Sequence, residues 1–187
     1  MKTLIIYTSQ TGFTKKYAQW IAEKVSGDLL DQKDARKKSG EFFDEYDAIC
    51  YGGWAMAGSI VKSKWFLEKA ADLKSKRLAM FCVGGSPSDN PDVDAYLQNA
   101  LTEEEKKYIK LFYCPGGFNY ENMKAPSRIA MKMFTSMLKN KKDATEKEKV
   151  MAEKMSSSYD ISDIKYIEPI VSYLEDAGNE KTEKDVE

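Results

Sequence analysis

Residues 3–14 read Thr3-Leu-Ile-Ile-Tyr-Thr-Ser-Gln-Thr-Gly-Phe-Thr14. The first five form an apolar run without polar alternation, which is typical of a strand buried in a parallel sheet. The next seven are mostly small and polar, and beyond them Ala18, Ile21, Ala22 and Val25 recur at helical spacing. A buried strand, a polar turn and an amphipathic helix make the first half of a βαβ unit.

Four further strands are expected along the chain. A weak second strand includes Leu29 and Leu30, and the others are Asp47–Tyr51, Leu78–Val83 and Ile109–Cys114. Amphipathic stretches separate these short apolar runs. This alternation predicts an α/β domain built on a parallel sheet.

Two of the predicted helices carry signals at their ends. One covers Val93–Leu101, with Asp92 as a candidate cap, and the last one begins near Ser162, a second candidate cap. Pro169 falls inside the last helix and should kink or split it, because proline lacks the backbone N–H that a helix interior uses.

The composition excludes several classes of function. Lys plus Arg number 29 against 30 for Asp plus Glu, so the chain lacks the basic character of a nucleic-acid binder. The absence of histidine excludes Ser-His-Asp and Cys-His catalysis, and no metal site is predicted. No window approaches the ~20 apolar residues of a membrane-spanning helix, and the start does not resemble a signal peptide. The three cysteines lie in apolar runs, which indicates buried free thiols in a reducing cytoplasm.

A Cys-x-Gly-Gly pattern repeats every 32 residues, at Cys50–Gly53, Cys82–Gly85 and Cys114–Gly117. Each copy is expected to end a strand, so the glycine pairs of a parallel sheet would share its carboxyl edge. Ligands of open α/β sheets bind outside that edge, and glycine lets a ligand approach the main chain closely. The alternative is that the pairs only form tight turns.

The polar turn Thr8–Thr14 is a candidate anion site. Hydroxyl groups and unpaired N–H groups at a helix N-terminus suit a phosphate. The turn lacks the lysine of a nucleotide-triphosphate loop and is not Gly-x-Gly-x-x-Gly. It is either a phosphate loop or a capped turn without a ligand.

The motif Thr8-x-x-Thr11-Gly12-x-Thr14 directly after the first strand resembles the phosphate loop of flavodoxins. The resemblance covers roughly residues 1–118 and the final helix. It implies a doubly wound, five-stranded parallel sheet of order 2-1-3-4-5 that binds FMN non-covalently. The flavin carries the redox chemistry in such a protein, so no catalytic acid or base is assigned.

The resemblance also implies three cofactor-binding segments. The loop after the first strand would bind the FMN phosphate through Thr8, Ser9, Gln10, Thr11, Gly12, Phe13 and Thr14. The loops after the third and fourth strands would hold the isoalloxazine ring through Gly52, Gly53, Trp54, Ala55, Met56, Ala57 and Gly58, and through Val83, Gly84, Gly85 and Ser86.

Within these segments Trp54 is expected to stack on the flavin, because a flat aromatic face shields the ring from water. The alternative is a tryptophan that only packs on the edge of the sheet. The loop after the fourth strand lacks an aromatic residue, so the opposite face of the ring is expected to be open. Main-chain groups of the glycine pairs are expected to bond the polar rim of the ring.

A single domain is expected over residues 1–178, with an insertion at 118–158 and a flexible tail at 179–187. The insertion holds or borders six of the nine methionines and includes a lysine-rich run at 139–149. Near-neutral charge and a basic, Met-rich insertion resemble the flavodoxin branch that includes the menaquinone-dependent protoporphyrinogen dehydrogenases.

The predicted function is electron transfer by bound FMN. The resemblance favours a flavin-dependent oxidoreductase acting on a quinone or porphyrin-like apolar substrate; the alternative is a carrier between protein partners. The partner is accordingly a redox protein or a small apolar electron donor or acceptor. A helix from Pro126 carries Ile129 and Met133 on one stripe. It would pack on the domain, form an apolar wall beside the flavin, or contact a membrane surface.

Overall fold

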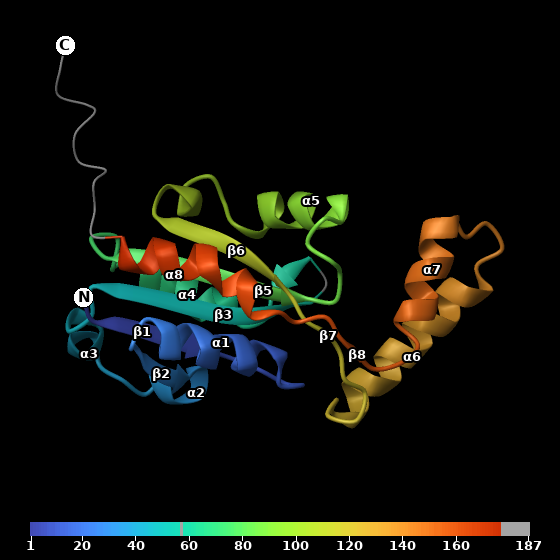
Figure 1. Ribbon diagram of the computed structural model, residues 1–187, viewed down its shortest axis with the longest axis horizontal. Helices are drawn as coiled ribbons and strands as arrows, with labels where there is room; N and C mark the ends of the chain where they lie inside the picture. The colour runs from blue at the N-terminus through green and yellow to red at the C-terminus, as the bar shows by residue number, and fades with distance from the viewer. Residues whose placement is uncertain (57, 177–187) are drawn as a thin grey trace, which may run out of the picture.

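A parallel sheet forms the centre of the computed structural model, which describes residues 1–56 and 58–176 (Figure 1). Its order is β2-β1-β3-β5-β6. The strands are β1 (Thr3–Tyr7), β2 (Asp28–Asp31), β3 (Ala48–Met56), β5 (Arg77–Gly84) and β6 (Ile109–Pro115). The short β4 (Ser59–Ile60) only forms an antiparallel hairpin with the end of β3. The predicted α/β class and the order 2-1-3-4-5 are therefore confirmed.

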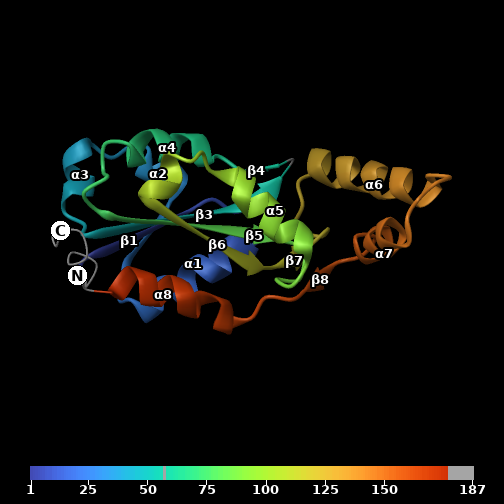
Figure 2. The same ribbon diagram turned by 90° about the horizontal axis from the view of Figure 1, so that it is seen from above.

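Helices cover both faces of the sheet. In Figure 2 one face carries α1 (Phe13–Lys24) and α8 (Glu168–Glu175), and the other carries α2 (Gln32–Ala35), α3 (Gly40–Asp44), α4 (Ser63–Ala70) and α5 (Pro91–Ala100). Two 3₁₀ turns, η1 (Glu105–Lys107) and η2 (Ile164–Ile167), precede β6 and α8. This is the doubly wound arrangement that buries a parallel sheet on both sides.

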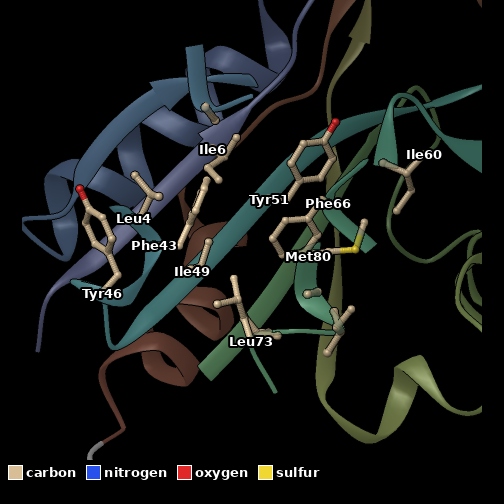
Figure 3. Packing of buried hydrophobic residues seen from close by; sticks show 14 of the residues in the cluster. Leu4, Ile6, Phe43, Tyr46, Ile49, Tyr51, Ile60, Phe66, Leu73 and Met80 are labelled. Atoms are coloured by element: carbon tan, nitrogen blue, oxygen red, sulfur yellow. The ribbon is translucent and has the colours of Figure 1, made fainter. Parts of the chain in front are cut away.

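Two apolar clusters fill the spaces between the sheet and its helices. Successive strand residues point to opposite faces, so Leu4 and Ile6 join one cluster and Ile5 joins the other. Figure 3 shows the first cluster, in which Leu4 and Ile6 lie with Phe43 of α3. Phe81 belongs to the second cluster, beneath α1 and α8.

The cysteines are buried and free, as predicted. Burial raises the pKa of Cys82 to about 12 and also raises the pKa values of Cys50 and Cys114. All three thiols are therefore protonated near neutral pH and pack as small apolar side chains.

The glycine pairs leave room for neighbouring side chains. Gly52 and Gly53 lie inside β3, which continues to Met56, so the expectation that the strand ends before them is wrong. A Cβ atom on Gly52 would overlap the ring of Phe81, and one on Gly53 would lie 2.6 Å from Cγ2 of Ile60. Neither glycine has a positive φ. Packing within the sheet accounts for this pair.

The segment predicted as an insertion leaves the carboxyl edge of the sheet. Strands β7 (Gly117–Phe118) and β8 (Tyr159–Asp160) pair antiparallel at its base. Between them α6 (Ala125–Asn140) and α7 (Glu146–Lys154) pack together and project beyond the sheet (Figures 1 and 2). None of the helices in the described ranges combines the length and hydropathy that crossing a membrane requires. The tail expected at 179–187 lies outside the described residues.

Pro169 splits the last helical segment as predicted, because it lies in the first turn of α8, where its missing N–H costs no hydrogen bond. Both cap assignments are wrong. Asn90, not Asp92, caps α5, because Pro91 starts the helix two residues earlier than expected. Asp163 rather than Ser162 caps η2 by accepting from the Lys165 N–H.

Gly52→Ala should lower the free energy of unfolding by about 1–3 kcal/mol, because the new methyl group must displace the buried Phe81 ring. The matched control is Gly40→Ala at the exposed start of α3, where a Cβ meets nothing within 4 Å. This control should stay within about 0.5 kcal/mol of wild type. Urea unfolding of both variants measures the difference, and equal stabilities would contradict the packing role.

Candidate functional site

One cavity lies at the carboxyl edge of the sheet, where the loop after β1 and the start of α1 meet the ends of β3 and β5 and the strand β7. It is lined by Gln10, Thr11, Phe13, Thr14, Trp54, Ala55, Val83, Gly84, Gly85, Gly117, Phe118 and Met123. Strands β1 and β3 are neighbours there, while the chain continues from β1 to β2 on the other side. The cavity thus adjoins the point where strand order reverses, the usual ligand position in open α/β sheets.

The start of α1 presents unpaired backbone donors to this cavity. Gly12 is the N-cap residue with φ of 104°, a conformation that favours glycine, and no described side chain caps the first turn. Ser9 Oγ accepts a 3.2 Å hydrogen bond from the Gly12 N–H and so holds the loop closed behind the helix. The free N–H groups of the first turn and the helix dipole together favour an anion.

The two ends of the loop are buried. Thr8 is 5% exposed, and its N–H donates to the Gly52 carbonyl at 2.9 Å, which extends the β1–β3 pairing by one residue. Thr14 is 2% exposed and lines the cavity from the first turn of α1. Thr8 therefore fixes the start of the loop, whereas Thr11 and Thr14 face the cavity.

Aromatic side chains from three elements line the cavity. Trp54 is half-buried on β3 and pairs in register with Val83 of β5. Phe13 contributes from α1, and Phe118 contributes from β7. Phe118 was not among the predicted site residues, because the resemblance implied only the loops after the first, third and fourth strands. Its position directly after the third glycine pair was the available signal.

Polar main-chain groups at the end of β5 already have partners. The Gly84 carbonyl accepts from the Gly116 N–H at 2.7 Å, and the Gly85 carbonyl accepts from the Tyr159 hydroxyl at 2.6 Å. Burial raises the pKa of Tyr159 to about 12, so this hydroxyl remains a donor. Each carbonyl thus accepts one hydrogen bond from within the protein, and the expectation that main-chain groups of the glycine pairs bond the rim of the ring stays a prediction.

Several predicted site residues do not line the cavity. Gly52 and Gly53 lie within the sheet, and Met56 and Gly58 belong to the β3–β4 hairpin beyond Trp54. Ser86 bonds through its main chain to the hydroxyl of Tyr113. Thr8, Ser9 and Gly12 do not line the cavity but hold the loop in place through hydrogen bonds. Ala57 lies outside the described residues.

Helix α6 touches the site only at its beginning. The side-chain amide of Gln10 donates to Ser127 Oγ at 3.1 Å, and Met123 lines the cavity just before the helix. The expected apolar stripe points elsewhere, since Ile129 and Met133 are 59% and 68% exposed. The stripe neither packs on the domain nor forms a wall beside the cavity, because α6 projects away from the sheet.

The chain returning from the insertion is fastened to α1. Lys16 Nζ lies 3.0 Å from Asp160 Oδ2 and donates to Ser162 Oγ at 2.7 Å. The Tyr17 hydroxyl donates to the Pro115 carbonyl at 2.6 Å and accepts from the Asp163 N–H at 3.1 Å. Both ends of the insertion are thus tied to the helix that begins the candidate anion site.

A family model described as "Flavodoxin domain" matches residues 4–145, more than half of the chain and every residue that lines the cavity. The chain is also 27% identical over 138 residues to the flavodoxin-like domain-containing protein BilS of Clostridioides difficile. That alignment covers 71% of this chain and 76% of BilS.

Solved structures show more distant similarity. A two-electron reduced flavodoxin from Megasphaera elsdenii has 23% identity and a TM-score of 0.44, covering 59% of this chain and 82% of that one. A flavoprotein from Lactobacillus acidophilus, solved in complex with FMN, has 19% identity and a TM-score of 0.41, covering 61% and 91%.

Tyr17→Phe should lower the free energy of unfolding by about 1–3 kcal/mol, because the buried Pro115 carbonyl and the Asp163 N–H lose their partner. The control is Tyr7→Phe, whose hydroxyl makes no hydrogen bond with a described residue. It should differ from wild type by about 0.5 kcal/mol or less. Thermal or urea unfolding measures both, and the bridge is refuted if the two variants are equally stable.

Proposed function

Because the chain belongs to the flavodoxin domain family, we propose that it binds FMN at the carboxyl edge of its sheet and transfers electrons through it. The observation that carries this proposal is the meeting of an uncapped helix N-terminus with aromatic walls in one cavity. FMN has the same two chemical parts, a phosphate and a flat ring. The bound flavin supplies the redox chemistry, and the protein supplies binding and orientation.

The phosphate would lie at the start of α1. The first-turn N–H groups and the hydroxyls of Thr11 and Thr14 are the available donors. Lys15 and Lys16 follow this turn directly, but neither lines the cavity, and Lys16 is paired with Asp160. Binding at this position rests on neutral donors and the helix dipole rather than on a lysine.

The ring would lie between Trp54 on one side and Phe13 of α1 and Phe118 of β7 on the other. The cavity encloses about 90 Å³, well below the roughly 300 Å³ at which ligand pockets usually begin. A tricyclic ring therefore keeps an edge outside the cavity, unless Trp54 or Phe118 moves aside. An exposed edge suits electron exchange with a second molecule.

That second molecule is either a small apolar substrate or a protein partner. The resemblance of the insertion to protoporphyrinogen dehydrogenases supports an oxidoreductase that acts on a quinone or porphyrin-like apolar substrate. The exposed stripe of Ile129, Met133 and Met137 favours the second candidate, a carrier that docks a protein partner. The three free cysteines favour a reducing compartment such as the cytoplasm.

Titration with FMN and with riboflavin, which lacks the phosphate, tests the two parts of the site separately. The left-handed conformation of residue 12 costs an alanine about 1–2 kcal/mol, so the free loop of Gly12→Ala should relax and must return to that conformation to bind the phosphate. FMN should therefore bind about tenfold more weakly, while riboflavin binding is unchanged. Trp54→Ala should weaken both ligands, since it removes a wall of the ring site. Gly40→Ala serves as the control that changes neither.

The outcome that refutes this assignment is an equal loss of both ligands in Gly12→Ala, because the loop would then not discriminate the phosphate. Failure of the wild-type protein to bind FMN would refute the proposed function itself.

Rapid mixing of the reduced, FMN-loaded protein with menadione separates the enzyme from the carrier. The oxidoreductase should be reoxidised faster than free reduced FMN at equal concentration and should saturate with menadione. A carrier should show no saturation. The flavin absorbance reports both, and the absence of saturation with every quinone screened would reject the apolar-substrate proposal.

A further inference from the structure

A second cavity adjoins the first one at Phe118. Both cavities share Gly85 and Phe118, and the second extends to α7, where Val150, Met151 and Met155 line it. It encloses about 240 Å³, more than the first. We call this second space the α7 cavity. A molecule in this cavity would contact Phe118, whose side chain also lines the proposed flavin site.

The walls of the α7 cavity are mostly apolar and adaptable, although Ser86 and Asn90 also line it. Met155 is 7% exposed and Met151 is 43% exposed, so one methionine forms the base while the other lies at the opening. Unbranched thioether side chains adjust their shape to flat ligands of different outline. Phe118 adds an aromatic surface, and its ring already pairs with Tyr159 at a centroid distance of 5.6 Å.

Two charged side chains line the α7 cavity and differ in their availability. Asp92, near the start of α5, is already engaged in an interaction within the protein. Lys154, at the end of α7, forms no ion pair with any residue in the described ranges. An apolar cavity with one available ammonium group at its edge complements an apolar ligand that carries an anionic group.

We propose that the α7 cavity binds a flat, apolar molecule carrying a carboxylate or sulfonate, with the anionic group on Lys154 and the ring system on Met151, Met155 and Phe118. The assignment of this molecule as the small reactant of the flavin rests on the proposed function. The binding itself rests on the cavity alone.

The fluorescent probe 8-anilinonaphthalene-1-sulfonate, ANS, combines a flat apolar ring system with one anionic group. Titrated into the FMN-loaded protein, it should bind with a stoichiometry near one at this site. Met151→Glu and Lys154→Glu should each raise its dissociation constant at least about tenfold. Lys154→Arg, which keeps the charge, should retain binding.

Matched substitutions on α6 control for adhesion of the probe to the exposed stripe. Met133→Glu and Lys132→Glu make the same chemical changes outside the α7 cavity and should leave the dissociation constant within twofold. Circular dichroism verifies that each variant keeps its helices. Loss of ANS binding in Met133→Glu, together with its retention in Met151→Glu, would overturn the proposal.

An FMN titration of the same variants separates this inference from the proposed function. FMN affinity should be unchanged in Met151→Glu and Lys154→Glu, since neither residue lines the first cavity. If FMN binds and ANS does not bind to the wild-type protein, the α7 cavity is no ligand site while the proposed function stands. If ANS binds as expected and FMN does not, the ligand site stands and its redox role falls.

Discussion

Burial of a parallel sheet on both faces constrains every other feature of this protein. Leu4, Ile5 and Ile6 are completely buried in β1, so no position of that run faces solvent. Helices must cover both sides, and each connection must cross from one end of the sheet to the other. The segments that follow the strands therefore gather at one edge, and the candidate site lies there.

The insertion at residues 118–158 completes the site, while its helices α6 and α7 project away from the sheet. Its base supplies Phe118 and Met123 to the first cavity, and its returning strand places Tyr159 on the Gly85 carbonyl. Tyr17 bridges the end of β6 and the start of η2. The start of α1, the end of β5 and the insertion are thus held together by hydrogen bonds rather than by the sheet itself.

The glycine pairs show how one sequence pattern serves different structural needs. Gly52 sits inside β3 and makes room for Phe81, whereas Gly117 has φ of 146° and lies against the main chain of Tyr159. Their equal spacing follows from the length of a βαβ unit. A ligand role shared by all three pairs does not follow from this spacing, because side chains from β4 and β5 already cover the first pair.

The sequence by itself located the five strands of the parallel sheet, indicated their order through the resemblance, and located the polar loop at the start of α1. These features depend on local apolar patterns and on a motif whose residues are adjacent in the chain. Only the tertiary structure decided what surrounds that loop. Phe118 and the start of α6 reach the cavity from more than a hundred residues away, and α7 has an apolar pattern too weak to predict. Which side chain fills the space above a glycine depends on strand register and packing, and these are set by contacts between distant segments.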